Sequence, residues 1–408
     1  MKSKDKFNKE VFEKYEYYKT KRNDKFFNGN IYKNSSLNIS KIVATIILCM
    51  MVTIGAVYSG VTIYNNRQAN LNPTYTGKMG DTDMNNLWVG TFQLVWNEFM
   101  DQRVDGIIEF EEGESNIVNE LNKRSFTKDM LSLKDYYIKV GPTNPKLKSE
   151  ILKDIKNKFN IKSSTVLDGI DFSIQEKGQS YTLYSILFKK FTFAQTFDKL
   201  KYPETFANSE NKIQYFGINN ASKEELNNNI TVLFYNNTSD FAVKLKTKEN
   251  EELLLYRINS DNSFNELYNQ ILQKSESYNG KKEFQKDDEL KIPYIDIDTI
   301  INYNDLCDKT IKGTNGLYIK NALQNVRFTL NEKGGNLISE AGLKDIYKSL
   351  NENSRYFYFT DKFVLFLKES DKNLPYLALR VDNTDILVKS KNWWKNDNER
   401  RNKHKIAL

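Results

Sequence analysis

A pair of aspartates in an alternating segment is the arrangement in this chain that comes nearest to a catalytic site. Asp296 and Asp298 lie in YIDIDTI. On a β-strand, residues two apart point to the same face, so the two carboxylates would lie within reach of each other. Such a pair could act as general acid and general base. No partner cluster accompanies it, so a solvated strand face explains the pattern better than an active site does.

Other residue types that carry chemistry are too few or wrongly spaced for a site. The acidic segment 106–114 (GIIEFEEGE) is more typical of an exposed turn than of a metal site. The chain has one histidine, His404 in a basic tail, and two cysteines, Cys307 and Cys49, the latter in an apolar run. These counts argue against a histidine-based triad, a zinc site and an intramolecular disulfide. We expect no enzyme, no metal and no other cofactor.

An uncharged apolar segment near the amino terminus predicts a membrane anchor. The segment 42–64 (IVATIILCMMVTIGAVYSGVTIY) is long enough to cross a hydrocarbon core as a helix. Residues 1–41 carry 11 Lys and Arg against 5 Asp and Glu, so the positive-inside rule places them in the cytoplasm and the rest outside the cell. A cleaved signal peptide is the rival interpretation, but its leader would be unusually long and no A-x-A site follows. A buried soluble helix is less favoured still.

The basic pI of about 8.9 arises at the two ends of the chain. Residues 389–408 carry 7 Lys and Arg against 2 Asp and Glu, whereas the long middle part is slightly acidic, so no nucleic-acid-binding face is implied. The tail holds Trp393 and Trp394 among these charges and could contact anionic wall polymer or lipid headgroups; a solvated tail is the alternative. The Lys- and Asn-rich composition without disulfides suggests a bacterial protein.

The remaining chain predicts a polar stalk and one large α+β domain. Residues 65–83 are polar and contain Pro73, Gly77 and Gly80, as a stalk would, and the domain is expected over 84–388. Helical spacing of apolar residues predicts helices over 87–99, 144–159 and 262–274. Short β-rich runs follow from residue 182 onward. They are 182–193, 212–218, 230–235, 240–247, 252–258, 294–300, 316–330, 363–369 and 375–381.

The order of motifs in the last third of the chain resembles the end of a serpin. Serpins have a Pro-led strand, then a strand ending in Asn-Glu-x-Gly, an exposed reactive loop, a Phe-rich strand and a last strand with Gly-Arg-Val. Matching residues are Asn331, Glu332 and Gly334 at the hinge, Asp361 and Phe363 after the loop, and Arg380 and Val381 at the end. The resemblance covers about 290–383 well and 181–260 in part. It implies a serpin-like multi-sheet α+β domain and a protease-inhibiting function.

The loop that follows the hinge departs from the family pattern but keeps an alternation. Serpins have Thr-Glu and a run of alanines here, whereas this chain has GNLISEAG, and the Pro before Phe363 and the Gly before Arg380 are missing. One set of alternate residues is small or apolar, and the other is mostly polar. The first set suits burial in a sheet, although its two leucines are larger than alanine. It comprises Gly335, Leu337, Ser339, Ala341 and Leu343.

The family spacing counted from Glu332 places the scissile bond at Lys348–Ser349, which would attract a trypsin-like serine protease. Lys344 and Arg355 are rival bait residues because the loop is longer than usual, and Lys348 as an ordinary loop lysine is the plain alternative. The sequence therefore predicts a surface-tethered serpin-like protease inhibitor. A non-inhibitory serpin-like binding or sensor module is the second hypothesis. A surface hydrolase is disfavoured by the lack of histidines.

Overall fold

A computed structural model describes most of the predicted extracellular domain. The predicted cytoplasmic segment, the membrane helix, the reactive loop (336–353) and all but the first two residues of the predicted tail (389–408) lie outside the described residues. No described helix is long and apolar enough to cross a membrane. The described residues are 70–71, 75, 84–104, 106–160, 167–173, 179–258, 260–335 and 354–390.

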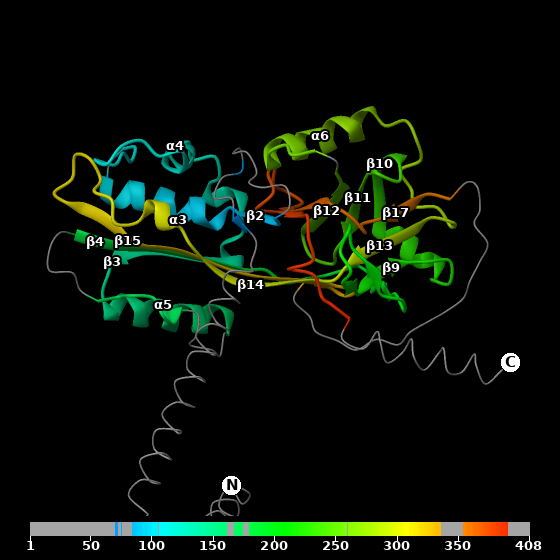
Figure 1. The fold of residues 1–408 in the computed structure, drawn as a ribbon, viewed down its shortest axis with the longest axis horizontal. Helices are drawn as coiled ribbons and strands as arrows, with labels where there is room; N and C mark the ends of the chain where they lie inside the picture. Colours follow the sequence, from blue (N-terminus) through cyan, green and yellow to red (C-terminus); the bar gives the residue numbers. More distant parts are fainter. Residues whose placement is uncertain are drawn as a thin grey trace, which may run out of the picture. The chain divides into compact units, whose positions relative to one another are not determined.

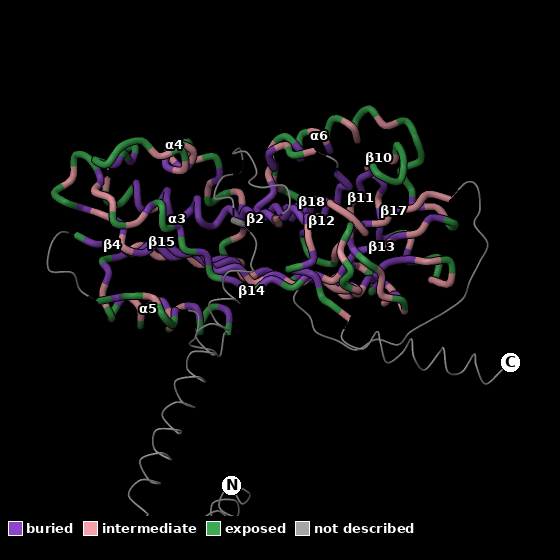
Figure 2. Tube along the Cα trace, in the orientation of Figure 1, coloured by how far each residue is buried: buried purple, intermediate pink, exposed green. Residues whose placement is uncertain are grey.

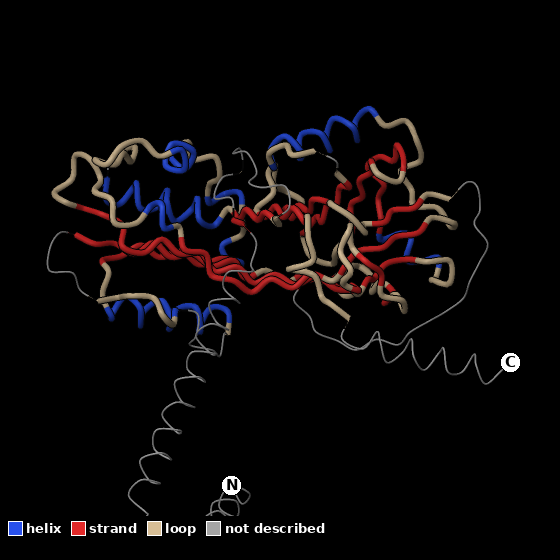
Figure 3. The backbone as a smooth tube through the Cα atoms, in the orientation of Figure 1, coloured by secondary structure: helices blue, strands red, loops and turns tan. Residues whose placement is uncertain are grey.

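Three larger β-sheets form the framework (Figures 1 and 3). In spatial order, the seven-stranded sheet contains β1 (Asn70–Leu71), β2 (Asn86–Val89), β19 (Leu377–Val381), β18 (Phe363–Glu369), β12 (Glu251–Arg257), β11 (Asp240–Lys246) and β10 (Ile230–Asn237). The six-stranded sheet contains β3 (Tyr136–Pro142), β4 (Gln179–Phe188), β15 (Leu317–Asn331), β16 (Gly334–Gly335) and β5 (Phe191–Thr192), with β14 (Ile295–Asn302) paired to β15. The four-stranded sheet contains β17 (Tyr356–Tyr358), β13 (Glu289–Pro293), β9 (Tyr215–Ile218) and β6 (Asp198–Lys199), and β7 (Glu204–Thr205) pairs with β8 (Lys212–Ile213).

The part of the chain that the structure describes contains four α-helices. They are α3 (Thr91–Phe99), which continues into a π-helical turn (Met100–Val104), α4 (Asn116–Asn122), α5 (Pro145–Phe159) and α6 (Phe264–Ser277). Short 3-10 turns span Lys128–Met130, Leu133–Asp135, Glu224–Asn229 and Asn304–Leu306. Helices early and strands late in the chain confirm the predicted multi-sheet α+β class.

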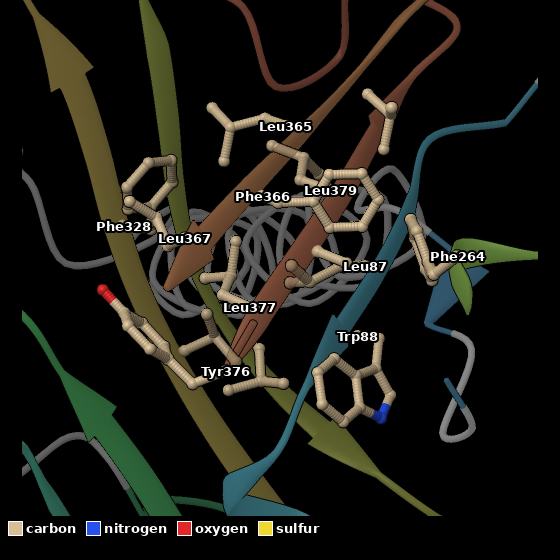
Figure 4. Packing of buried hydrophobic residues seen from close by; sticks show 14 of the residues in the cluster. Leu87, Trp88, Phe264, Phe328, Leu365, Phe366, Leu367, Tyr376, Leu377 and Leu379 are labelled. Carbon is tan, nitrogen blue, oxygen red and sulfur yellow. The ribbon is translucent and has the colours of Figure 1, made fainter. Parts of the chain in front are cut away.

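The seven-stranded and six-stranded sheets share one apolar core. Strands β18 and β19 are buried along their whole length, as expected for near-continuous apolar runs. Phe366 of β18 packs against Phe264 and Tyr268 of α6, with ring centroids 6.3 and 5.3 Å apart. Figure 4 shows leucines of β18 and β19 in the same cluster as Phe328 of β15. The shared apolar core therefore holds the seven-stranded sheet, on which α6 packs, against the six-stranded sheet, which contains β15.

Helices lie on both faces of the six-stranded sheet (Figure 1). Helix α3 covers one face and α5 covers the other. The apolar side of α5 packs on Tyr184 and Ile186 of β4 and on Leu323 of β15, in a small cluster separate from the main core. Because both faces are covered, β4 and β15 are buried along most of their length (Figure 2).

The second and third predicted helices are present, and the predicted cap of the second, Asn144, is confirmed, but the first helix begins later than expected. Asn144 accepts a hydrogen bond from the Leu147 amide at 2.9 Å, with Pro145 in the first turn. Ser263 and Glu266 form a capping box on α6. The apolar stripe predicted as one helix over 87–99 is instead β2 followed by α3. Leu87 lies in β2 because that strand pairs with β19.

Part of the segment predicted as a stalk belongs to the domain. Strand β1 pairs in parallel with β2. Tyr75 is buried, its ring centroid lies 4.7 Å from that of Trp88, and its carbonyl accepts a hydrogen bond from the Asn265 amide. The domain therefore starts before Met84, because its amino-terminal edge needs β1 and Tyr75 to cover β2 and Trp88.

We expect Asn144→Ala to lower the free energy of unfolding by about 1 kcal/mol, because one amide of the first turn of α5 loses its side-chain acceptor. Urea unfolding measures the change, and Lys146→Ala, on the same helix and well exposed, is the control. Equal stability of the two variants would contradict the role of the cap.

Candidate functional site: the β16 hinge and the β4–β15 seam

The centre of the six-stranded sheet is a parallel seam between two strands far apart in sequence. Strands β4 and β15 pair in register from Gln179 with Leu317 to Phe188 with Arg327, with one irregularity near Asn321. On its other edge, β15 pairs with β14. The seam is therefore closed along the whole of β4, and opening it would break a long parallel ladder.

The predicted hinge forms a hairpin at the end of this seam. After β15 the chain turns at Glu332 and Lys333, and β16 returns with Gly335 opposite Leu330. Leu330 also pairs with Ile295 of β14. A strand has only two edges, so β16 lies on the edge of β15 that β4 occupies farther along. Strand β5, which follows β4 in the chain, pairs with the other side of β16.

Both glycines of β16 are required by close packing against β5. Gly334 has φ +133°, and a Cβ atom there would lie 2.4 Å from the carbonyl oxygen of Phe191. A Cβ atom at Gly335 would lie 2.7 Å from the ring of Phe191. The predicted hinge residues Gly334 and Gly335 therefore let the chain enter between β15 and β5.

Glu332, the third described hinge residue, is buried in the turn of this hairpin. The hydroxyl of Tyr294 donates a hydrogen bond to its Oε2, and Oε1 has no hydrogen-bond partner among the described residues. Burial and this contact raise the pKa of Tyr294. The Phe197 amide donates to the Glu332 carbonyl at 2.9 Å and the Phe193 amide to the Lys333 carbonyl at 2.8 Å. The turn is thus held by backbone and side chain together.

Arg355, at the carboxy-terminal end of the predicted loop, is a structural anchor. Its guanidinium donates to Asp288 Oδ2 at 2.6 Å and to the carbonyls of Lys281 and Glu283 at 2.7 and 2.6 Å, and its amide donates to Asp288 Oδ1. Asp288 is buried. The side chain is therefore not free to enter a protease pocket, which removes Arg355 as a rival bait residue.

A buried lysine beside the hinge joins the two large sheets. Lys189 directly follows β4, and its Nζ lies 2.5 Å from carboxylate oxygens of Asp135 and Glu251 and 3.1 Å from Glu369. Glu251 and Glu369 belong to β12 and β18 of the seven-stranded sheet. The three carboxylates have the spacing of a metal site, but the lysine ammonium binds all three. The cluster therefore fastens the end of β4 to the neighbouring sheet.

One lysine faces three buried carboxylates in this cluster, so burial is not fully offset at every carboxyl group. Burial raises the pKa of Glu251 to about 7, because Lys189 offsets only part of the cost of burying three carboxylates. Hydrogen bonds from Ser132 and Lys189 outweigh burial at Glu369 and lower the pKa of that carboxyl. The Tyr376 hydroxyl donates to Glu251 at 2.7 Å. Glu251 and Glu369 therefore have pKa values shifted in opposite directions.

Polar side chains interrupt the apolar packing halfway along the seam. Gln324 donates to the carbonyl of Val89 at 3.0 Å and to Thr91 Oγ1 at 2.8 Å, and it accepts from the Tyr303 hydroxyl at 2.7 Å. Among the described residues, buried oxygens of Ser185 and Asn325 have no hydrogen-bond partner. Unsatisfied buried polar atoms cost free energy, so this part of the seam is less stable than its apolar flanks.

The structure describes only some of the residues that the sequence predicted to be functional. Leu337, Ser339, Ala341, Lys344, Lys348 and Ser349 lie outside the described residues. Asp296 and Asp298 are exposed on β14, where Asp298 pairs with Arg327 at 2.9 Å, and burial with the neighbouring carboxylate raises the pKa of Asp296. The sequence analysis missed the Lys189 cluster. Its signal was a lysine inside the otherwise apolar run YSILFKKFTF.

Comparisons with known proteins find similarity in solved structures. No protein-family model and no curated protein matches the chain. Serpin48, a highly specific serpin of the insect Tenebrio molitor, is 11% identical over 73% of this chain and 91% of its own, with a TM-score of 0.43. Human thyroxine-binding globulin in complex with its hormone is 11% identical over 72% of this chain and 98% of its own, with a TM-score of 0.42.

We expect Gly334→Ala to destabilise the protein by about 2 kcal/mol or more, because it adds a clash with β5 to an unfavourable φ. Gly313→Ala is the matched control, since Gly313 also has a positive φ but open space around its Cβ position, so it should cost only about 1 kcal/mol. Urea unfolding gives both values. Equal costs would show that β16 is not packed against β5.

The lysine cluster predicts a pH dependence of stability. The pKa of Glu251 is raised on folding, so its contribution to stability is fully present below about pH 4.5 and is lost as the pH rises through about 7. Glu251→Gln mimics the protonated form and removes this dependence. The stability of the variant relative to the natural chain should therefore grow by up to about 3 kcal/mol between pH 5 and pH 8.

Urea unfolding at several pH values between 5 and 8 tests this prediction. Glu252→Gln is the control, because the pKa of Glu252 is lowered and its effect should stay constant over the same range. A Glu251→Gln difference that does not change with pH would mean that Glu251 is ionised throughout.

Proposed function

We propose that the protein is a membrane-tethered, extracellular serpin-like protease inhibitor whose reactive loop is 336–353. The hinge of that loop is Glu332, Gly334 and Gly335, continuing into Leu337, Ser339 and Ala341. The observation that carries the proposal is the position of β16, a strand already inserted between β15 and β5 at the end of the closed seam. If the loop continued β16 in the same direction, it would lie between β4 and β15.

The register of β16 supports insertion of the loop up to the proposed bait residue. Gly335 lies opposite Leu330 of β15 and opposite Phe191 of β5. Continued regularly, this antiparallel register places residue 338 opposite both Arg327 and Phe188, the two residues that close the seam. It places Lys348 opposite Leu317, the first residue of β15. The loop from the hinge to the bait therefore has the length of the seam.

Insertion would exchange one parallel ladder for two antiparallel ladders. Strands β4 and β15 run in the same direction, so a strand that is antiparallel to one is antiparallel to both. Antiparallel pairing is slightly more stable per residue, and the added strand satisfies its backbone donors and acceptors on both sides. The loop residues thereby gain hydrogen bonds that an exposed loop lacks within the protein.

The side-chain alternation of the loop matches the two faces of the sheet. A Cβ atom at Gly335 would point at the Phe191 ring, which belongs to the main core. Residues of the same parity, Leu337 and Leu343 among them, would face this core, and each buried leucine would contribute roughly 2 kcal/mol. The mostly polar set, which includes Glu340 and Lys344, would face the side that α5 covers.

Trapping of a protease follows from these steps. The serine hydroxyl of a trypsin-like protease attacks the carbonyl carbon of Lys348, the Lys348–Ser349 bond breaks, the amino group of Ser349 leaves, and the protease becomes an ester of Lys348. Insertion then carries the ester-linked protease to the far end of the seam. Arg355 keeps the other side of the cleaved loop attached to the four-stranded sheet. Trapping requires that insertion be faster than hydrolysis of the ester.

The experiment is incubation of the full-length protein in detergent micelles with trypsin-like serine proteases, followed by a denaturing gel. We expect a band at the summed mass of the two proteins, which Lys348→Ala abolishes. Lys344→Ala, which keeps Lys348, is the matched control and should leave the band in place. Cleavage without a complex would overturn the inhibitory function and favour the non-inhibitory alternative.

Thermal unfolding of the cleaved protein provides a second readout that does not depend on the choice of protease. An inserted strand adds a ladder of backbone hydrogen bonds, so cleavage within 336–353 should raise Tm well above that of the intact protein. An unchanged Tm would mean that the loop does not enter the seam.

A further inference from the structure

The outer edge of β3 forms a slot at the side of the six-stranded sheet. Among the described residues, β3 pairs only with β4, so no described strand covers its other edge. A pocket of about 460 Å³ is lined by five consecutive residues of β3, 136–140. Consecutive strand residues point to opposite faces. A pocket that touches all five must therefore lie along the strand edge rather than on either face.

The slot is bounded above and below by helical layers. Glu98 of α3 and Lys128 line one wall, and Lys158 of α5 lines the other. Tyr137 contacts α5 through Asp154, whereas Ile138 packs toward the main core on the opposite face. Figure 1 shows β3 between α3 and α5. The space therefore continues the layer of the sheet beyond β3, and an additional extended segment would fit into it.

The lining of the slot carries excess positive charge. Lys128, Lys139 and Lys158 line it against a single carboxylate, that of Glu98. Lys128 pairs with Glu98 and Lys139 pairs with Glu150 of α5 at 3.3 Å. Lys158 donates to the Leu133 carbonyl at 2.7 Å, but no carboxylate of the described residues lies within ion-pair distance of it. Lys158 is exposed, and partial desolvation lowers its pKa, an effect that the charge of Asp135 offsets in part.

The mouth of the slot also exposes an apolar side chain. Leu133 is 70% exposed and lines the pocket together with Tyr136. An occupant would therefore meet apolar surface, cationic side chains and the free backbone groups of β3 in one narrow space.

We propose that this slot binds an extended, acidic segment of a partner protein, which adds to β3 as a further strand of the six-stranded sheet. Main-chain hydrogen bonds to β3 would supply affinity, and alternate side chains of the segment would meet Leu133 and the lysines, a mode known as β-augmentation. The bound segment would carry acidic residues at every second position, opposite Lys139 and Lys158. The lining of this slot includes none of the predicted hinge residues, and the proposal does not depend on protease inhibition.

Selection from a phage library of random linear dodecapeptides on the full-length protein in detergent micelles tests the proposal. We expect selected peptides to alternate acidic and apolar residues. Lys158→Glu should weaken their binding about tenfold, because a charge in the slot wall is reversed. Lys156→Glu reverses an exposed charge on the same helix outside the slot and should leave binding unchanged. Cooperative urea unfolding checks that both variants fold.

Three outcomes would overturn the proposal. Peptides without the alternating acidic pattern, or equal effects of Lys158→Glu and Lys156→Glu, would show that affinity comes from elsewhere. Failure to enrich any peptide over a surface without protein would show that the slot is closed or already filled by this chain. A concentration-dependent dimer that Lys158→Glu disrupts would assign the slot to a second copy of the chain.

Discussion

The parallel pairing of β4 with β15 is the constraint on which the rest of the domain depends. It joins residues 179–188 to residues 317–327, closes the centre of the six-stranded sheet and provides the floor on which α5 packs. It also determines where the β15–β16 hairpin, the proposed hinge, lies. Because β4 ends at Phe188 while β15 continues to Asn331, the end of β15 has a free edge, and β16 occupies it. The position of the β15–β16 hairpin follows from the difference in length of two paired strands.

The residues around this free edge are held by interactions of very different kinds. Glycines permit the backbone of β16 to approach β5, a buried glutamate holds the turn, and Lys189 fixes the end of β4 to the seven-stranded sheet. Replacing a buried ion cluster by apolar residues is often neutral for stability, whereas removing one member is costly. The lysine cluster is thus better explained as a device that fixes the position of β4 than as a source of net stability.

Local sequence signals predicted most of the secondary structure correctly. Strands with continuous apolar runs, such as β12 and β18, and helices with an apolar stripe, such as α5 and α6, were found because each signal lies within a few residues of the element it defines. Strand β3 and helix α4 were not predicted. The error at residues 87–99 has a tertiary cause. An apolar stripe there fits a helix, but pairing with β19 makes its first turn a strand.

The sequence by itself determined the α+β class, the main strands and two helix starts, and the motif Asn331-Glu332 with Gly334 at the hinge, because these depend on side-chain periodicity, caps and short motifs. Only the tertiary structure decided that Arg355 is an anchor, that Lys189 meets three carboxylates and that β16 enters the end of the seam. Each of these contacts joins residues about 55 to 180 positions apart. Such contacts are set by sheet order and register, which local patterns in a single chain do not encode.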